Sequence, residues 1–175
     1  MKYFKKLVGE RIYISPMNSD DAEIYTKWLN NSEITKYLSI HSSLVCVPGE
    51  REYLETFCKQ EFHMCIVKLE NDELIGNISL ENIDYKNGSA ELGIFIGEER
   101  NLGKGYGSEA IKLLTNFGFK ELRLHTIYLR VFNINERAKK AYTKCGFIEC
   151  GRMHEALYRD GKYYDIIYME LINKE

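Results

Sequence analysis

A glycine-rich turn between a strand and a helix constrains the fold of this chain more than any other stretch of its sequence. The turn reads Gly97-Glu-Glu-Arg-Asn-Leu-Gly-Lys-Gly-Tyr-Gly-Ser108, with alternating glycines at 103, 105 and 107. Residues without a Cβ let the backbone approach a ligand closely. The free N–H groups at the start of the next helix can then bind phosphate oxygens, and Lys104 could add a positive charge. The stretch predicts an anion-binding strand–turn–helix unit. A glycine-rich helix start without a ligand is the alternative.

The apolar patterns around this turn predict a single α/β domain over residues 1–175. Strands are expected at 11–15, 62–69, 74–80, 90–96, 125–131, 147–153 and 163–171. Helices are expected near 20–30, after Pro48-Gly49, over 106–117 and over 136–144. An antiparallel meander is followed by strand–helix–strand and then by a helix and a hairpin. We therefore expect one central sheet, mixed but mostly antiparallel, flanked by about four helices.

Composition excludes several classes of protein. A net charge of −2 gives no sign of binding to nucleic acid or to an anionic membrane. No apolar stretch approaches the roughly 20 residues that span a bilayer, and the N-terminus lacks the features of a secretion signal. The five cysteines include no C-x-x-C pair and the four histidines are scattered, which argues against a disulfide framework and a metal site. We expect a cytoplasmic protein without a metal, a nucleic-acid partner or a membrane partner.

Two well-known phosphate motifs fit the turn poorly. A P-loop has four residues between its first glycine and Gly-Lys, but here five residues separate Gly97 from Gly103, and Lys104 is followed by Gly105. The dinucleotide fingerprint matches loosely as Gly105-x-Gly107-x-x-Ala110. That fingerprint follows the first strand of a βαβ unit and has an acidic residue about 20 positions further on, and neither feature is found here. A Rossmann-like nucleotide-binding domain remains the alternative.

A third motif matches better. The segment Ile96–Ala110 resembles the acetyl-CoA signature of the GNAT superfamily, whose core is Arg/Gln-x-x-Gly-x-Gly/Ala. Arg100-x-x-Gly103-x-Gly105 satisfies this core literally, but the wider resemblance favours the register in which Leu102 takes the place of the Arg or Gln. The resemblance implies a GNAT-like fold and acetyl-CoA as the acetyl donor. The cofactor-binding residues that it implies are Phe95, Ile96, Leu102, Gly103, Lys104, Gly105, Tyr106, Gly107 and Ser108.

A second segment of the same family lies further along the chain. Residues 133–147 resemble its Asn-x-x-Ala-x-x-x-Tyr-x-x-x-Gly-Phe segment. The resemblance implies that Asn135 binds the pantetheine arm and that Tyr142 is the general acid that protonates the leaving thiolate. Glu91-Leu-Gly93 resembles the family's Glu-Leu/Ile-Gly segment, so Glu91 is the candidate base, acting directly or through water. The alternatives are a packed tyrosine, an asparagine that only caps a helix, and a solvated strand glutamate.

The N-terminal and C-terminal parts resemble one branch of the family. Lys27–Ile34 and Glu155–Asp165 are similar to segments of ribosomal-protein N-terminal acetyltransferases, and polyamine acetyltransferases are similar too. The resemblance implies that Trp28 lines the acceptor site, with a core tryptophan as the alternative. We expect a monomer or homodimer that transfers acetyl directly from acetyl-CoA to a primary amine of a small molecule or a peptide N-terminus. A catalytically silent CoA-binding sensor is a further alternative.

Overall fold

The computed structural model describes residues 2–60 and 62–174. Their contacts divide the chain into two compact units. The first consists of Met1–Ser79 and Ile94–Leu113, and the second of Leu80–Gly93 and Leu114–Glu175. We describe each unit by itself, and the assignment of 1–175 as one domain stays a prediction.

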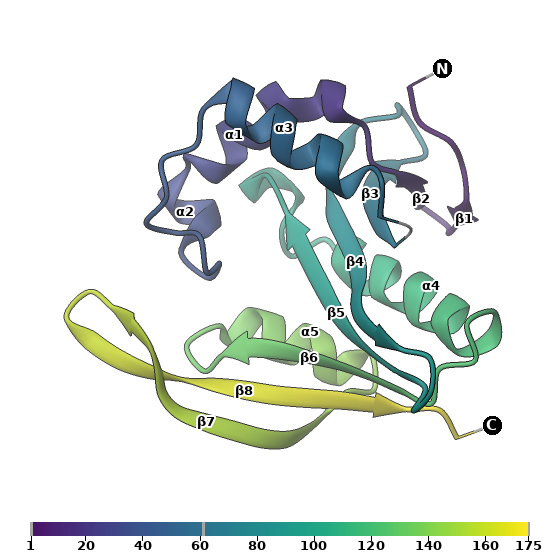
Figure 1. Ribbon diagram of the computed structural model, residues 1–175, viewed down its shortest axis with the longest axis vertical. Coiled ribbons are helices and arrows are strands. Elements are labelled where there is room, and N and C mark those ends of the chain that lie inside the picture. The colour runs from purple at the N-terminus through teal and green to yellow at the C-terminus, as the bar shows by residue number, and fades with distance from the viewer. Residues whose placement is uncertain (1, 61, 175) are drawn as a thin grey trace. The chain divides into compact units, whose positions relative to one another are not determined.

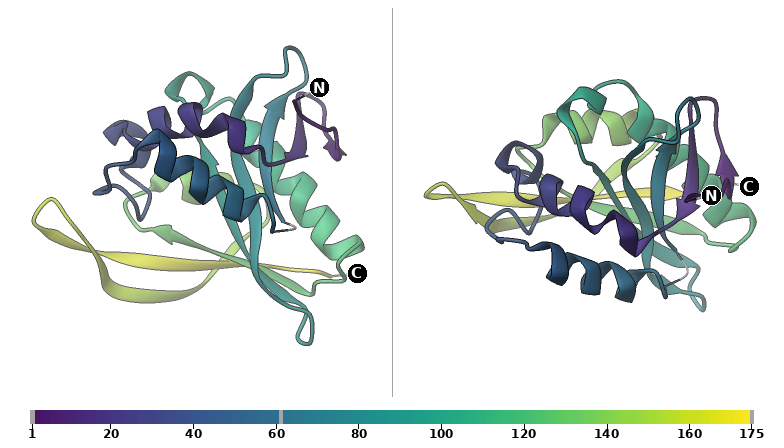
Figure 2. Two further views of the ribbon diagram at one scale, coloured as in Figure 1. Left: turned by 45° about the horizontal axis from the view of Figure 1, so that its top comes forward. Right: turned by 90° about the horizontal axis from the view of Figure 1, so that it is seen from above.

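The first unit is built from short antiparallel strands, three helices, and the end of β5 (Ser89–Ile96) with the first half of α4 (Tyr106–Lys120) (Figure 1). Its strands are β1 (Leu7–Val8), β2 (Ile12–Pro16), β3 (His63–Lys68) and the first half of β4 (Leu74–Asp84). Its helices are α1 (Ala22–Leu29), α2 (Ser32–Thr35) and α3 (Val47–Phe57), of which α1 and α3 run side by side (Figure 2). A 3-10 turn at Ser19–Asp21 precedes α1, and the Asn18 side chain caps it by accepting a hydrogen bond from the Asp20 N–H.

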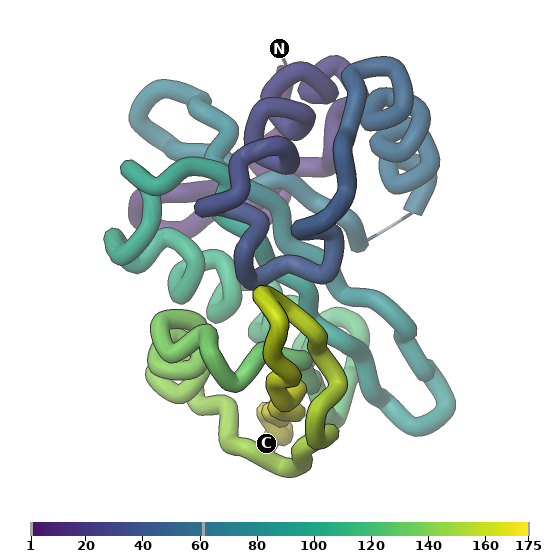
Figure 3. The backbone as a smooth tube through the Cα atoms, turned by 90° about the vertical axis from the view of Figure 1, so that its left-hand side faces the viewer, coloured from purple at the N-terminus to yellow at the C-terminus, as the bar shows by residue number. Residues whose placement is uncertain are grey.

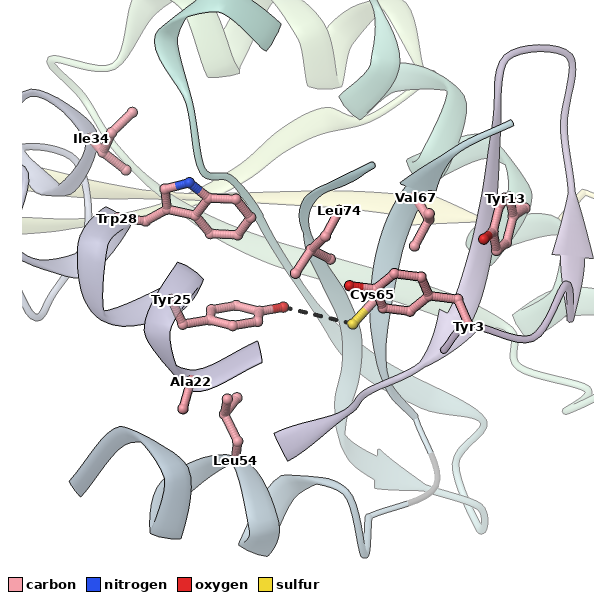
Figure 4. Packing of buried hydrophobic residues seen from close by; sticks show 10 residues of the cluster. All are labelled: Tyr3, Tyr13, Ala22, Tyr25, Trp28, Ile34, Leu54, Cys65, Val67 and Leu74. Atoms are coloured by element: carbon pink, nitrogen blue, oxygen red, sulfur yellow. Dashed lines mark hydrogen bonds between the residues drawn. The ribbon is translucent and has the colours of Figure 1, made fainter. Parts of the chain in front are cut away.

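A cluster of buried aromatic and aliphatic side chains holds this unit together (Figure 4). Trp28 on α1 is 2% exposed and packs edge-on against Tyr25 and Phe95, with ring centroids 5.2 and 5.7 Å away. The Tyr25 hydroxyl lies 3.8 Å from the Cys65 Sγ, so the buried phenol has a polar neighbour. Burial of such large rings is the main favourable contribution to folding.

The second unit is a sheet with the C-terminal hairpin at its edge. It contains the second half of β4, most of β5 (Ser89–Ile96), the C-terminal part of α4 (Tyr106–Lys120) and the elements that follow. These are β6 (Thr126–Phe132), α5 (Glu136–Lys144), β7 (Ile148–Arg159) and β8 (Lys162–Ile172). The two long strands of the hairpin run side by side (Figure 3). Their turn, Asp160-Gly161, has φ values of 51° and 76°, as tight hairpin turns need.

The strands of the chain follow the hydrogen-bonded order β1-β2-β3-β4-β5-β6-β8-β7. β5 and β6 are parallel, whereas β6–β8 and β7–β8 are antiparallel. The mixed α/β fold predicted from the sequence is therefore confirmed. No helix among the residues that the structure describes combines the length and the hydropathy of a membrane span.

One short strand and one short α-helix were not predicted. Two strands, β4 and β7, extend beyond the predicted ranges of 74–80 and 147–153. β1 has two residues and α2 has four, too few for a periodic pattern to show. With α2, the described residues form five α-helices where about four were expected. β4 continues to Asp84 although polar residues follow Leu80, because this part is the start of a hairpin with β5.

Candidate active site

The glycine turn lies in the first unit, between β5 and α4. Gly103 and Gly105 have φ values of +72° and +86°, a region that residues with a Cβ rarely adopt. A Cβ on Gly103 would meet no atom within 4 Å, so the backbone angle, and not crowding, is what requires glycine there. α4 begins directly afterwards, at Tyr106. The predicted strand–turn–helix junction is therefore present, with the free N–H groups of a helix start at its end.

Gly107 differs from its two neighbours in the turn. It lies inside the first turn of α4, and its φ is not positive. A Cβ here would make ordinary contacts, 3.7 Å from Ile94 Cδ1 and 3.8 Å from Ile96 Cγ1. Neither strain nor crowding within the protein explains this glycine. The missing side chain would lie against these two residues of β5.

Arg11, in the loop before β2, fixes the conformation of the turn. Its Nε donates to Glu109 Oε2 at 2.9 Å, and its Nη1 donates to the Lys104 carbonyl at 2.9 Å. Glu109 also accepts hydrogen bonds from the backbone N–H groups of Arg11 and Ile12. Partial burial of Glu109 opposes its ionisation, but these hydrogen bonds outweigh it and hold the pKa of the carboxyl below its ordinary value. Sequence reasoning missed Arg11 because nothing local links it to a turn more than 90 residues away.

We expect Gly105→Ala to damage the turn and Gly107→Ala to be tolerated. At position 105, the new Cβ would have to adopt a φ near +86° and would lie 3.2 Å from Arg11 Nη2. The substitution should lower the free energy of unfolding by about 1–2 kcal/mol. Gly107→Ala, the matched control, should change it by less than about 0.5 kcal/mol. Urea unfolding of both variants measures this, and equal stabilities would contradict the assignment of strain to Gly105.

The other predicted residues of the first unit are located as follows. Phe95 and Ile96 form the end of β5, where the Gly97 N–H donates to the Ile75 carbonyl at 2.9 Å. Trp28 lies against Gly97, so closely that a Cβ on this glycine would overlap the indole ring. Its Nε1 donates to Glu98 Oε1 at 3.5 Å. The Trp28 ring thus packs in the core against the end of β5. Its role in acceptor binding stays a prediction.

In the second unit, a helix-ending motif holds Tyr142 in place. The Gly146 N–H bonds to the Thr143 carbonyl and the Phe147 N–H to the Tyr142 carbonyl, with φ +97° at Gly146. This is a Schellman motif, whose usual apolar contact is made here by the Tyr142 and Phe147 rings, 6.1 Å apart. The Tyr-x-x-x-Gly-Phe spacing therefore has a structural meaning as well, because it ends α5 and orients the tyrosine ring.

The Tyr142 hydroxyl is protonated at neutral pH and has no hydrogen-bond partner among the described residues. The side chain is 9% exposed, and burial, with the nearby Cys145 thiol as a second cause, raises the pKa of Tyr142 to about 12. Among residues 2–60 and 62–174, no group forms a hydrogen bond with this hydroxyl. The hydroxyl oxygen is not among the fully enclosed atoms without a partner, so water or a ligand can reach it.

Asn135 caps α5 and keeps donors for another contact. Its Oδ1 accepts a hydrogen bond from the Ala138 N–H at 3.1 Å. Its Nδ2 has no acceptor in the part of the chain that the structure describes. The Oδ1 atom therefore caps the helix, whereas the Nδ2 group can donate to a carbonyl oxygen.

Glu91 on β5 is held by two donors that the sequence did not reveal. Arg130 Nε on β6 donates to its Oε1 at 2.6 Å, and Asn82 Nδ2 on β4 donates to its Oε2 at 3.1 Å. The carboxylate is 9% exposed, so it is not a solvated strand residue. The hydrogen bond to Glu91 raises the pKa of the Arg130 guanidinium above its ordinary value. Neither partner could be found from spacing, since both depend on strand register.

The predicted site residues are thus divided between the units. The first unit contains the turn residues Leu102–Ser108 together with Phe95, Ile96 and Trp28, and the second contains Glu91, Asn135 and Tyr142. Asn135 and Tyr142 lie at the two ends of α5.

Comparison with known proteins identifies the family. A family model described as an acetyltransferase (GNAT) domain matches residues 11–148. A protein of Bacillus licheniformis named as an uncharacterized N-acetyltransferase is 28% identical over 97% of both chains. The spermidine N(1)-acetyltransferase of Vibrio cholerae is 34% identical over 63% of both chains.

Solved structures show the same fold. The crystal structure of spermidine N-acetyltransferase from Vibrio cholerae, in complex with CoA and spermine, superposes with a TM-score of 0.82 at 26% identity and covers 92% of this chain and 95% of that one. A GNAT acetyltransferase from Bacillus anthracis superposes with a TM-score of 0.84 at 20% identity over 97% and 99% of the two chains. The predicted resemblance is confirmed: the chain belongs to the GNAT family of acetyltransferases and is an acyltransferase.

Proposed function

We propose that this enzyme transfers the acetyl group of acetyl-CoA directly to a primary amine of a small molecule or a peptide N-terminus. The observation that carries the proposal is the Tyr142 hydroxyl, which belongs to a side chain only 9% exposed, is protonated, and has no hydrogen-bond partner among the described residues. Acyl transfer from a thioester produces an anionic thiolate, and an oriented hydroxyl can protonate it. Family membership and a structural relative in complex with CoA support the choice of donor.

The residues present fit coenzyme A. The backbone amides of the glycine turn and the start of α4 would bind the pyrophosphate, with Lys104 as a nearby cation. The Asn135 Nδ2 would donate to a carbonyl of the pantetheine arm, and the backbone of Phe95 and Ile96 would lie beside the thioester. Leu102 replaces the Arg or Gln of the signature without loss of these contacts, because the amides make them.

The proposed reaction balances without a further reactant. The neutral amine attacks the thioester carbonyl, the new C–N bond forms and the C–S bond breaks. Tyr142 gives its proton to the departing sulfur and is reprotonated from solvent. The excess proton of the amine passes to Glu91 through water. Each Glu91 oxygen accepts one hydrogen bond from Arg130 or Asn82 and retains a second lone pair for this water.

We also place the enzyme in the cytoplasm and without a metal cofactor. Its five cysteines form no disulfide in the part of the chain that the structure describes, which suits a reducing compartment. Direct transfer between bound donor and acceptor needs no metal.

A screen of amine acceptors tests the function. Purified protein would be incubated with acetyl-CoA and a panel of peptides with free N-termini, polyamines, amino sugars and amino acids, and the released thiol would be measured. Release that depends on one class of amine is the expected result. Tight CoA binding without transfer to any amine would favour the silent sensor, and binding of NAD in place of CoA would favour a nucleotide-binding domain.

A further inference from the structure

One face of the C-terminal sheet is open and polar. Along β6, Ile127, Leu129 and Val131 are buried, whereas Tyr128 is half-buried and Arg130 is exposed. α5 covers the buried face, since a Cβ on Gly146 would lie 3.2 Å from Leu171 of β8. On the open face, Tyr168 of β8 stands directly opposite Arg130. The open face therefore presents a guanidinium between two phenol rings.

The parallel ladder ends at this point of the sheet. β5 and β6 pair from Ser89–Thr126 to Glu91–Tyr128, three residue pairs in all. Glu91 is thus the last paired residue of β5, and Arg130 lies two residues beyond its pairing partner. From Leu129 onward β6 pairs with no described residue of β5, so backbone groups of this edge can bind a ligand beside the ion pair.

The structure holds the Glu91 carboxylate in a fixed orientation. Asn82, which donates to it, has a φ of 51°, which is unusual for a residue inside a strand. Such strain of order 1–3 kcal/mol is typical of functional sites. Arg130 makes the second contact through Nε alone, and its side chain is 53% exposed. Its Nη1 and Nη2 groups form no hydrogen bond with any described residue, so they can donate to a ligand.

We propose that the Glu91–Arg130 ion pair binds an acceptor that carries an anionic group beside its amine, as an α-amino acid does. This inference rests on the proposed function and names its substrate class. Glu91 presents a negative charge to the amine, and Arg130 presents its two NH2 groups, Nη1 and Nη2, to a carboxylate. The two charged groups of the protein lie side by side, with 2.6 Å between Nε and Oε1, and so match two groups of opposite charge separated by one carbon atom.

A polyamine acceptor fits this surface less well. Arg130 would place a cation against the chain of positive charges, and like charges brought together this closely repel each other. The phenols of Tyr128 and Tyr168 add hydroxyl groups that can donate to oxygen atoms. The further carboxylate on this face, Glu170, stands opposite Tyr128 and interacts with Cys150.

Matched acceptors test the inference. Alanine, lysine and tyrosine would each be compared with their amides and with ethylamine, cadaverine and tyramine, in the thiol-release assay with saturating acetyl-CoA. We expect a lower KM for the acids than for either neutralised form. Arg130→Gln should raise the KM of the acids by about 10- to 100-fold, since it removes a charge-assisted hydrogen bond. The KM of the amides and amines should rise less than that of the acids, because they carry no anionic group for Arg130 to bind.

The control variants separate charge from folding. Lys162→Gln removes a positive charge from the exposed start of β8, and it should leave the preference for acids unchanged. Arg130→Lys keeps a cation and should retain part of the preference if Arg130→Gln fails to fold. Equal kcat/KM for acids and amides in the unmodified enzyme, or a preference that survives Arg130→Gln, would overturn the inference and leave acetyl transfer intact. Absence of thiol release with every amine would overturn the proposed function as well.

Discussion

Tyr142→Phe should lower kcat by at least about 100-fold while leaving the affinity for CoA within about threefold of the unmodified enzyme. The substitution removes only the hydroxyl, and the ring contact with Phe147 that completes the end of α5 is retained. No described residue uses this hydroxyl as a hydrogen-bond partner, so its loss should leave no buried group unpaired. Stopped-flow or steady-state thiol release gives kcat, and calorimetric titration with CoA gives the affinity.

Tyr85→Phe is the matched control for this change. Tyr85 belongs to the same unit, is 66% exposed and lies outside the proposed site. We expect its kcat to be unchanged. If Tyr142→Phe retained more than half of the normal kcat, Tyr142 would be a packing residue of α5, and the proton for the thiolate would have to come from another donor.

The pH dependence offers a second readout on Tyr142. Because burial raises the pKa of Tyr142 to about 12, the phenol remains protonated throughout the range in which the enzyme can be assayed. Loss of the general acid through ionisation should therefore not limit kcat between about pH 7 and pH 10. An alkaline decline centred below pH 10 that is absent from Tyr142→Phe would contradict the raised pKa.

Glu50→Gln should stabilise the protein by about 2–3 kcal/mol above pH 7. Glu50, in the first turn of α3, is 4% exposed and has no ion-pair or side-chain hydrogen-bond partner among the described residues. Burial raises its pKa from 4.5 to about 7. In the folded protein the neutral form is thus favoured, and ionisation at higher pH costs stability that a neutral glutamine would not lose.

The direction of the pH effect follows from the two pKa values. The stability contributed by protonated Glu50 is fully present below about pH 4.5 and is lost as the pH rises through about 7. The free energies of unfolding of the two proteins should therefore coincide near pH 4 and separate as the pH increases. Urea titrations at pH 4, 6 and 8 measure this difference.

Glu52→Gln provides the comparison on the same helix. Its side chain is exposed, so we expect a change below about 0.5 kcal/mol at every pH. If Glu50→Gln were less stable than the unmodified protein at pH 8, the Glu50 carboxylate would have a favourable partner, and its burial would not be a cost.

Elements could be predicted where the residues that determine them lie within the same short segment of sequence. α5 was predicted at its observed bounds because Asn135 and Gly146 are a start signal and a stop signal within the helix's own segment. The turn glycines were recognised for the same reason, although only the structure separates the two that adopt positive φ from Gly107, which does not. The family was recognisable from these two segments alone.

Contacts that depend on register or on packing could not be predicted. Arg130 reaches Glu91 because β5 and β6 pair at Glu91–Tyr128, and no spacing in the sequence encodes this pairing. Glu50 follows Pro48-Gly49 and looks like an ordinary first-turn acid, yet it is nearly inaccessible. Arg11 supports a turn more than 90 residues away. Of these residues, Arg130 and Arg11 belong to the candidate site, and Glu50 affects the stability of the first unit.

Trp28 gives this enzyme a built-in optical reporter. It is the one tryptophan among the 175 residues, beside 13 tyrosines, and its ring lies against the backbone of Gly97, where the glycine turn begins. Its fluorescence emission therefore reports on one unit alone, whereas circular dichroism of the backbone averages over both. Denaturation curves recorded by the two signals would coincide if the units melt together and would separate if either melts first. The same emission would allow a ligand at the turn to be titrated without a label.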